Sequence, residues 1–437
     1  MNRPVYRSIN KSISALFFCL ITLAQGAFSQ GQLAQDVHWV ATWGTSPLLA
    51  VASLPTWIQP PPADQLPADP PPSPIPPVPA VLNDETVRMV VRTSIGGDGL
   101  RLQFSNAQGL DPVILGAVHI ASHSGNGAIE PASDRAVTFS GKPSVTLRPG
   151  ALVISDPVEL KTEALEELAV SVYLPLPTAT DTRHELGLNT TYIVPGNAVV
   201  DPGPTSNNSN RSYFWLTGIE TIAPTYSATI VAFGDSITDG YATTADSHRA
   251  WPALLANRLQ DNPATADLGV INMGISGNRV LRNNIGTSAL ARFDRDVLAR
   301  SGVAWVILME GINDITWSAL PGAPVSEHAS ADAVIEGLSQ LVDRAHAHGI
   351  KVMGATMTPM EGLWLFNKET EAMRLAVNEW IRTSGKYDAV VDFDAVTRDP
   401  QRPSQLRPAQ DSGDHIHPND AGNAAMADAI DITEFLR

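Results

Sequence analysis

The sequence predicts an α/β region with a parallel sheet, preceded by an all-β sandwich, and two observations lead to this fold class. Between Glu85 and Gly218, short segments alternate apolar and polar side chains, with turn-forming residues clustered between them, which is typical of a β-sandwich. From Thr229 on, segments that are apolar throughout alternate with segments of helical periodicity, which indicates a parallel sheet covered on both faces. The length of 437 residues leaves room for both regions.

Residues 1–30 have the layout of a secretory signal peptide. Three basic residues and no acid accompany an uncharged, mainly apolar run from Ile13 to Ala24, and small residues follow at Gly26 and Ala27. The run is shorter than the ~20 residues that a membrane span needs; an anchoring or buried N-terminal helix is the alternative. We therefore expect a mature chain that is secreted to the extracellular space or the periplasm, without stable membrane insertion.

Charge and cysteine content exclude several classes of protein. The net charge is −16, and the basic leader leaves the rest of the chain more acidic still. A nucleic acid is therefore not an expected partner, because its binding depends on Lys and Arg neutralising phosphates. The single cysteine, Cys19, lies within the leader, which excludes a disulfide scaffold, an iron–sulfur cluster and a thiolate zinc site.

The first predicted domain, a jelly-roll-like β-sandwich, spans residues 31–222. It opens with a strand around Trp39 and Trp43, and eleven of the 34 prolines then lie between Pro60 and Pro79. That stretch predicts a long loop over 59–82, with a ligand for a proline-binding module as the alternative. Further strands are predicted at Thr86–Thr93, Gly99–Ser105, Val113–Ile120, Ala136–Phe139, Ala151–Ile154, Leu168–Leu174 and Tyr213–Thr217.

The second predicted domain spans residues 223–437 and carries the parallel sheet. Its strands are predicted at Ile230–Phe233, Val270–Met273, Val303–Met309, Lys351–Ala355 and Ala389–Phe393, and its helices at Trp251–Leu259, Ala331–Ala347 and Glu369–Thr383. In such a sheet a ligand binds beyond the carboxyl ends of the strands. Residues that directly follow the strands are therefore the candidates for chemistry.

Three of these strand ends carry residues suited to catalysis. Ser236 follows the first strand in a tight turn before a helix, where a nucleophile would be exposed, although a helix cap is the alternative. Gly277 follows the second strand, and its backbone N–H could donate to a developing oxyanion. Asn313 follows the third strand and could aim its side-chain amide at the same atom. Plain turns are the alternative for the last two.

A fourth candidate segment lies near the C-terminus. Asp414 and His417 are three residues apart, so the carboxylate could orient the imidazole that takes a proton from a serine hydroxyl. A metal site formed by Asp414, His415 and His417 is the alternative, which the adjacent spacing disfavours. We expect His415 to be a neighbour rather than the base.

Together these four segments resemble the SGNH hydrolases, a branch of the GDSL esterases and lipases, from Val231 to about Ile430. The segments read Phe233-Gly234-Asp235-Ser236-Ile237-Thr238-Asp239-Gly240, Asn272-Met273-Gly274-Ile275-Ser276-Gly277, Gly311-Ile312-Asn313-Asp314 and Asp414-His415-Ile416-His417-Pro418. The first has Ser-Ile where the family name has Ser-Leu, and this replaces one apolar residue by another. The resemblance implies a three-layer α/β/α fold, flavodoxin-like in outline.

The resemblance also implies a role for each residue. Ser236 would be the nucleophile, His417 the base and Asp414 the acid that orients it. The backbone amides of Ser236 and Gly277 and the side chain of Asn313 would form the oxyanion hole. The implied mechanism needs no metal and no organic cofactor.

Three segments of the first domain, Trp39–Trp43, Val91–Gly97 and Leu102–Asn106, are similar to the leading β module of bacterial carbohydrate acetylesterases and arylesterases. We therefore expect a secreted serine esterase that removes acetyl groups from a polysaccharide or oligosaccharide. A lipase, arylesterase or lysophospholipase-type acyl hydrolase is the alternative. A carbohydrate-binding protein without catalytic activity is a further one, which the four intact segments disfavour.

Overall fold

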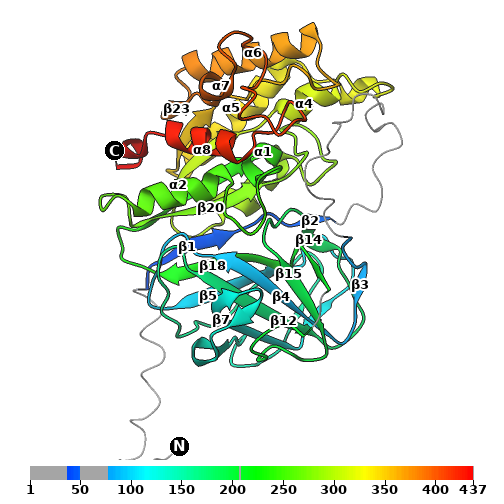
Figure 1. The fold of residues 1–437 in the computed structure, drawn as a ribbon, viewed down its shortest axis with the longest axis vertical. Coiled ribbons are helices and arrows are strands. Elements are labelled where there is room, and N and C mark those ends of the chain that lie inside the picture. The colour runs from blue at the N-terminus through cyan, green and yellow to red at the C-terminus, as the bar shows by residue number, and fades with distance from the viewer. Residues whose placement is uncertain (1–36, 50–76, 206–207, 437) are drawn as a thin grey trace, which may run out of the picture. The chain divides into compact units, whose positions relative to one another are not determined.

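Strands dominate the described residues up to Ile222, and strands alternate with helices after Ala228 (Figure 1). The computed structural model describes residues 37–49, 77–205 and 208–436. The expected signal peptide and most of the proline-rich stretch lie outside the described residues. Residues His38–Arg437 form one compact unit. We call residues 38–222 the β-rich region and residues 228–436 the α/β region.

Two antiparallel sheets make up most of the β-rich region. One has the order β1-β18-β5-β11, and the other has the order β16-β15-β4-β12-β7-β8, with β9 paired to β7. The first contains β1 (Trp39–Gly44), β18 (Leu216–Ile222), β5 (Leu100–Ser105) and β11 (Leu152–Ile154). The second contains β16 (Ser209–Asn210), β15 (Thr191–Pro195), β4 (Glu85–Arg92), β12 (Glu167–Leu174), β7 (Ala117–Gly125), β8 (Ala128–Ile129) and β9 (Arg135–Ala136).

Short strands complete the β-rich region. They pair β10 with β6, β13 with β3, and β14 with both β17 and β2. Their bounds are β2 (Leu48–Leu49), β3 (Val81–Leu82), β6 (Val113–Leu115), β10 (Val145–Leu147), β13 (Thr178–Ala179), β14 (Thr182–His184) and β17 (Tyr213–Phe214), and a short helix, η2, spans Pro131–Ser133. Strand β3 directly follows the proline-rich stretch.

Both large sheets contribute to one apolar core. Alternate residues of each strand point to the same side, because successive side chains of a strand face opposite ways. The buried residues of this core include Val87, Met89 and Val91 of β4, Leu168, Val170 and Val172 of β12, and Leu100, Leu102 and Phe104 of β5. The period-two pattern of the sequence is therefore the pattern of burial.

Two predicted strands of the β-rich region are each divided in the structure. The segment predicted as Val113–Ile120 breaks at Gly116, between β6 and β7, which belong to different sheets. The segment predicted as Tyr213–Thr217 breaks at Trp215, which is fully buried and has a φ of 56°. There the chain passes from β17 to β18, which pair with different neighbours. Alternation alone does not show where a chain changes sheets.

The α/β region contains a parallel five-stranded sheet with the order β20-β19-β21-β22-β23. Gly234 of β19 is level with Gly274 of β20 and with Met309 of β21. These three strands therefore end at the same edge. Their bounds are β19 (Ala228–Gly234), β20 (Leu268–Gly274), β21 (Val303–Met309), β22 (Lys351–Ala355) and β23 (Ala389–Val391).

Helices pack against both faces of this sheet, as the alternation within β19 shows. Val231 and Phe233 share a core with α3 (Ala289–Phe293), α5 (Ala331–Ala347) and α6 (Lys368–Thr383). Ile230 and Ala232 share another core with α2 (Trp251–Gln260), α7 (Phe393–Thr397) and α8 (Asp420–Ala429). The remaining helices are α1 (Ser236–Asp239), α4 (Ile312–Trp317), η3 (Asp294–Leu298), η4 (Val325–Glu327) and η5 (Ile432–Leu436).

The fifth strand is shorter than the sequence predicts. The expected strand Ala389–Phe393 ends at Val391, and Phe393 begins α7. The Asp392 carboxylate accepts a hydrogen bond from the backbone N–H of Ala395 and so caps that helix. Asp is among the strongest N-cap residues, so the chain begins a helix at Phe393 and does not extend the strand.

The β-rich region packs against the edge of the parallel sheet. Strand β1 contacts β20 and β19, and Ala41 of β1 belongs to a core of the α/β region. The backbone N–H of Ala41 donates to the Thr229 hydroxyl at 3.1 Å, and the N–H of Val270 donates to the Ser94 hydroxyl at 2.9 Å. In the part of the chain that the structure describes, no helix is long and apolar enough to span a membrane.

Candidate active site

The four predicted segments meet at the carboxyl edge of the parallel sheet. Ser236 is the first residue of α1, directly after β19, and Asn313 lies in α4, after β21. Gly277 lies in the loop after β20, and His417 in the loop before α8. The N–H of Ile275 donates to the carbonyl of Gly234 at 3.0 Å, which joins the first two segments. All the predicted site residues are therefore at the edge where a ligand site was expected.

Ser236, His417 and Asp414 form a continuous chain of hydrogen bonds. Ser236 Oγ lies 2.8 Å from His417 Nε2, and His417 Nδ1 lies 2.6 Å from Asp414 Oδ2. The other carboxylate oxygen of Asp414 accepts from the backbone N–H of His417 at 2.9 Å. Although burial opposes it, the contacts with His417 hold the pKa of Asp414 well below its usual value. The carboxylate is therefore ionised at neutral pH and fixes the imidazole from behind.

The turn that presents Ser236 depends on its two preceding residues. The Asp235 side chain accepts from the N–H of Ile237 at 3.0 Å and caps α1. Burial raises the pKa of Asp235 to about 7, against the opposing effect of His417 and Arg292. A Cβ atom at Gly234 would lie 2.1 Å from the Thr238 hydroxyl and 2.5 Å from the Met309 carbonyl. Only glycine therefore allows α1 to lie this close to the strand ends.

His415 belongs to a separate pair. Its Nδ1 lies 2.6 Å from Asp411 Oδ2, and its side chain is about half exposed. His415 and His417 thus pair with different carboxylates. Among the described residues there is no group of three or more His, Cys, Asp or Glu side chains arranged to hold a metal ion.

The predicted N–H donors lie on segments that follow strands ending at the same edge of the sheet as the strand before Ser236. Gly277 has a φ of 76°, and its amide has no hydrogen-bond partner within the described chain. Asn313 is largely buried, and one N–H of its amide donates to the Asn278 carbonyl at 2.9 Å, which leaves the second N–H available. Ser236 stands at the start of a helix, where backbone N–H groups lack intrahelical partners.

Asp314 holds the glycine loop from its other end. Its carboxylate accepts from the backbone N–H groups of Val280 at 2.7 Å and Leu281 at 3.1 Å. Burial raises the pKa of Asp314 to about 6. The helix that carries Asn313 thus also fixes the chain that follows Gly277.

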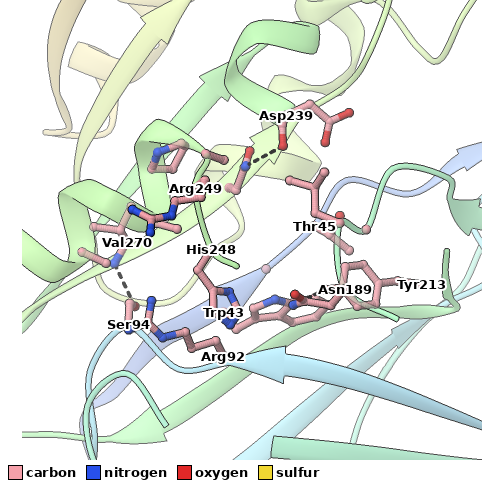
Figure 2. Close-up of a pocket in the computed structure, with 18 of the residues that line it drawn as sticks. Trp43, Thr45, Arg92, Ser94, Asn189, Tyr213, Asp239, His248, Arg249 and Val270 are labelled. Carbon is pink, nitrogen blue, oxygen red and sulfur yellow. Dashed lines mark hydrogen bonds between the residues drawn. The ribbon is translucent and has the colours of Figure 1, made fainter. Parts of the chain in front are cut away.

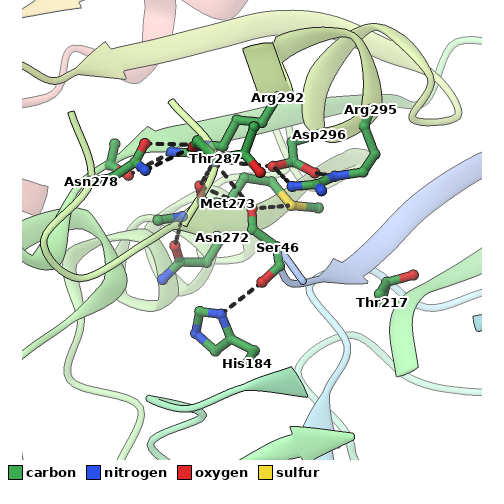
Figure 3. A network of polar contacts seen from close by, with 12 residues as sticks. Ser46, His184, Thr217, Asn272, Met273, Asn278, Thr287, Arg292, Arg295 and Asp296 are labelled. Carbon is green, nitrogen blue, oxygen red and sulfur yellow. Dashed lines mark hydrogen bonds and ion pairs between the residues drawn. The ribbon is translucent and has the colours of Figure 1, made fainter. Parts of the chain in front are cut away.

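A buried arginine that sequence reasoning missed connects the strand ends (Figure 3). Arg292 donates to the carbonyls of Gly234 at 2.9 Å and Met273 at 2.7 Å, and its Nε donates to Asn278 Oδ1 at 2.9 Å. Its guanidinium also pairs with Asp296 and with Glu310, each at 3.2 Å. A buried charge must be paired and hydrogen-bonded. These contacts join the ends of β19 and β20 to Glu310, the residue that follows β21.

The sequence carried one signal for Arg292. It lies in a short helix between the buried residues Ala289 and Phe293, so it occupies a position that faces the interior. A charged residue at such a position indicates a buried partner, but the pattern does not identify which one. Tyr241, also missed, lies with its ring centroid 4.4 Å from that of His417 and so covers one side of the imidazole.

A cavity of about 120 Å³ lies between the two regions, and Ser236 is not among the residues that line it (Figure 2). Trp43, Arg92 and Tyr213 line it from the β-rich region, and His248 and Val270 line it from the α/β region. None of the predicted site residues is among those that line it. Asp239, the last residue of α1, forms part of its wall.

Residues 232–425 match the family model of the GDSL-like lipase/acylhydrolase family. No curated protein matches the chain.

Similar solved structures include three that cover about half of the chain. A GDSL-like lipase from Bacteroides thetaiotaomicron is 20% identical over 48% of this chain and 88% of its own, with a TM-score of 0.34. An alpha/beta hydrolase from the metagenome of Lake Arreo is 24% identical over 47% of this chain and 94% of its own, with a TM-score of 0.37. An acetylxylan esterase from Geobacillus stearothermophilus is 25% identical over 46% of this chain and 91% of its own, with a TM-score of 0.36.

The family match covers all four predicted segments, from the strand before Ser236 to beyond His417. Residues 232–425 therefore form a GDSL-like lipase/acylhydrolase domain, and the protein is a carboxylic ester hydrolase.

Proposed function

We propose that this protein is a secreted serine esterase in which Ser236 is the nucleophile, His417 the general base and Asp414 its orienting acid. The observation that carries the proposal is the unbroken chain of contacts at 2.8 Å and 2.6 Å from Ser236 Oγ through both ring nitrogens of His417 to the Asp414 carboxylate. A hydroxyl is a weak nucleophile unless an adjacent base removes its proton.

Hydrolysis proceeds in two halves. Ser236 Oγ attacks the ester carbonyl while its proton passes to His417 Nε2, and the tetrahedral intermediate collapses when His417 returns that proton to the leaving alcohol. Water then attacks the acyl-enzyme with His417 again as the base, which releases the acid and restores the serine hydroxyl. Asp414 stabilises the imidazolium that forms in each half.

Three N–H donors stabilise the negative charge that develops on the carbonyl oxygen. They are the backbone amides of Ser236 and Gly277 and the free side-chain N–H of Asn313. These groups are held in advance, because Asn313 is anchored on Asn278 and the glycine loop on Asp314. Donors that need no reorganisation stabilise a transition state more than flexible ones do.

For the substrate class, we propose an acetylated polysaccharide or oligosaccharide. Ile285 fills the space beside Gly277, where a Cβ would lie 2.7 Å from its methyl group, and Tyr241 covers His417 on another side. These two side chains narrow the space around Gly277 and His417, which favours a small acyl group. The net charge of −16 also opposes binding to an anionic lipid surface or a nucleic acid. Lipid and aryl esters remain the second class to test.

The domain organisation and export are part of the same proposal. Residues 1–30 would be removed as a signal peptide, residues 31–222 would form the β-sandwich and residues 223–437 the three-layer hydrolase domain. Helices on both faces of the parallel sheet and the core that the two antiparallel sheets share support this division. N-terminal sequencing of the exported protein would test the cleavage site.

The direct test is hydrolysis of p-nitrophenyl acetate by the wild type and by Ser236→Ala. The proposal predicts turnover that disappears in the variant, whereas no turnover by the wild type would favour a carbohydrate-binding protein. Acetate release from acetylated xylan, pectin and xyloglucan, compared with hydrolysis of lipid esters, then separates the two substrate classes.

A further inference from the structure

A buried histidine of the β-rich region reaches the first catalytic segment. His184, the last residue of β14, is 4% exposed. Its Nε2 lies 3.0 Å from Asp239 Oδ1, and its Nδ1 lies 2.9 Å from the backbone carbonyl of Ser46 (Figure 3). Asp239 is the last residue of the helix that Ser236 begins. Residues 55 positions apart thus form a buried contact beneath the site.

The partners of His184 fix its charge. A backbone carbonyl only accepts hydrogen bonds, and so does an ionised carboxylate, so both ring nitrogens must carry hydrogen. His184 is therefore an imidazolium paired with Asp239. Burial opposes this charge, but Asp239 and the hydrogen bond to Ser46 outweigh burial and raise the pKa of His184.

Asp239 passes this contact on to the glycine loop. Its second oxygen, Oδ2, accepts from the backbone N–H and from the hydroxyl of Ser276, both at 2.9 Å. Ser276 directly precedes Gly277, whose amide is a proposed oxyanion donor. One carboxylate thus joins the nucleophile's helix to the loop that carries this donor.

Ser46 makes a second connection from the β-rich region. Its hydroxyl donates to the carbonyl of Met273 at 3.3 Å and accepts from Arg292 Nη1 at 3.2 Å. Met273 is the penultimate residue of β20, and Arg292 holds the ends of the neighbouring strands. Ser46 is fully buried. It contacts His184 through its backbone carbonyl, and Met273 and Arg292 through its hydroxyl.

We propose that His184 and Ser46 are positioning residues for ester hydrolysis, so that the β-rich region forms part of the catalytic apparatus rather than an independent module. His184 fixes the orientation of Asp239, and Asp239 fixes the Ser276–Gly277 amides relative to Ser236. Ser46 acts on the same loop through Met273 and Arg292. The inference rests on the proposed function of Ser236 and Gly277.

The chain offers a matched control for this test. His38 Nε2, from the β-rich region, contacts the carbonyl of Ser227 at 2.9 Å, in the connection just before the α/β region. Ser227 directly precedes β19, so this contact lies at the amino end of the strand, opposite Ser236. His38→Gln and His184→Gln therefore each alter a contact that a histidine of the β-rich region makes with a residue outside that region, but only His184 contacts the helix that Ser236 begins.

The experiment measures kcat, KM and Tm for both variants with p-nitrophenyl acetate, well below the lowest Tm. We expect His184→Gln to lower kcat about 10- to 100-fold, because displacing an oxyanion donor by ~1 Å has an effect of that order. KM should change less than about threefold, since the donor acts on the transition state. His38→Gln should keep the wild-type kcat.

A double variant tests whether His184 acts through Asp239. The kcat of His184→Gln/Asp239→Asn should be no lower than that of the worse single variant, because both changes break one connection. If the fold-losses in kcat of the two single variants multiply in the double variant, His184 does not act through Asp239. If His184→Gln fails to fold, Ser46→Ala serves instead and should lower kcat roughly fivefold, because the hydroxyl's hydrogen bonds with Met273 and Arg292 are lost.

The outcomes separate this inference from the proposed function. If hydrolysis by the wild type depends on Ser236 but His184→Gln and Ser46→Ala keep the wild-type kcat and lose only thermal stability, the contacts are merely structural and the inference is wrong. If Ser236→Ala retains full activity, the proposed function itself fails, whatever His184 does.

Discussion

Two histidine–aspartate pairs in different parts of the molecule differ in the group that faces the second ring nitrogen. His417 pairs with Asp414 at 2.6 Å, and its other nitrogen faces the Ser236 hydroxyl. His184 pairs with Asp239 at 3.0 Å, and its other nitrogen faces a backbone carbonyl. A hydroxyl can donate or accept, whereas a carbonyl only accepts.

This difference determines what each histidine can do. His417 Nε2 can exist without a proton and take one from the serine, which a general base requires. His184 must keep both protons to satisfy its partners, so it serves as a fixed cation. Contact with a carboxylate therefore does not by itself identify a catalytic histidine. The distinction comes from the group that faces the other ring nitrogen, which is a hydroxyl for His417 and a backbone carbonyl for His184.

The largest effect on activity is expected at Ser236, whose hydroxyl faces the second ring nitrogen of His417. Ser236→Ala should lower kcat by about 10⁴-fold or more, as the loss of a triad member does. Because only a hydroxyl is removed from a turn, the fold and the Tm should be preserved. Steady-state kinetics on purified protein with a circular dichroism melt would check both expectations, and wild-type activity in the variant would exclude Ser236 as the nucleophile.

The second prediction separates His417 from its neighbour. His417→Ala should lose nearly all activity, whereas His415→Ala should have a milder effect, because His415 pairs with Asp411 and faces no nucleophile. Chelator treatment should leave wild-type activity unchanged. The reverse ranking of the two variants would contradict the pairing of His417 with Asp414 as the working base.

A smaller loss is expected at the third oxyanion donor. Asn313→Ala should lower kcat by about 10²–10³-fold, roughly 3–4 kcal/mol of transition-state stabilisation, with KM nearly unchanged. Asn313→Asp should be at least as damaging, because a carboxylate repels the oxyanion. A rise in KM alone would identify Asn313 as a contact to the bound substrate in its ground state.

The smallest expected effect is a change in thermal stability with pH, and it comes from the pair His184–Asp239. The pKa of His184 is raised above its unfolded value of ~6.5. The stabilisation is therefore fully present below that pH and is lost as pH rises through the folded-state pKa. The facing titratable groups are Asp239 and the stacked Tyr213, whose own pKa burial raises.

Melting curves of the wild type and His184→Gln across pH would check this prediction. The difference in Tm should be largest in mildly acidic buffer and should shrink as pH rises. A difference that grows with pH would mean that His184 is neutral in the folded protein.

The two pairs also show what sequence can and cannot predict. Asp414 and His417 are three residues apart, so their pairing follows from local spacing, whereas His184 and Asp239 come from different regions. A pairing between distant residues depends on how the regions pack, which a single sequence does not reveal. Arg292 was missed for the same reason, because its partners include Gly234 and Met273, on two different strands, and Glu310, which follows a third.

The fold shows the same limit. The strands Val303–Met309 and Lys351–Ala355 and the helix Ala331–Ala347 have the predicted bounds, because apolar runs and helical periodicity are local signals. The break at Trp215, where the chain changes sheets, was not predicted. The helix Asp420–Ala429 was also missed, although Asn419 caps it through the N–H groups of Ala421 and Gly422.

Covalent labelling with a fluorophosphonate, followed by peptide mass spectrometry, tests directly whether Ser236 is the nucleophile. An activated serine displaces fluoride and forms a stable phosphonyl ester, so we expect one adduct, on the peptide that contains Ser236. Labelling should be nearly absent in His417→Ala and retained in His415→Ala. An adduct on another residue would mean that Ser236 is not the nucleophile, and equal labelling of wild type and His417→Ala would mean that His417 is not its base.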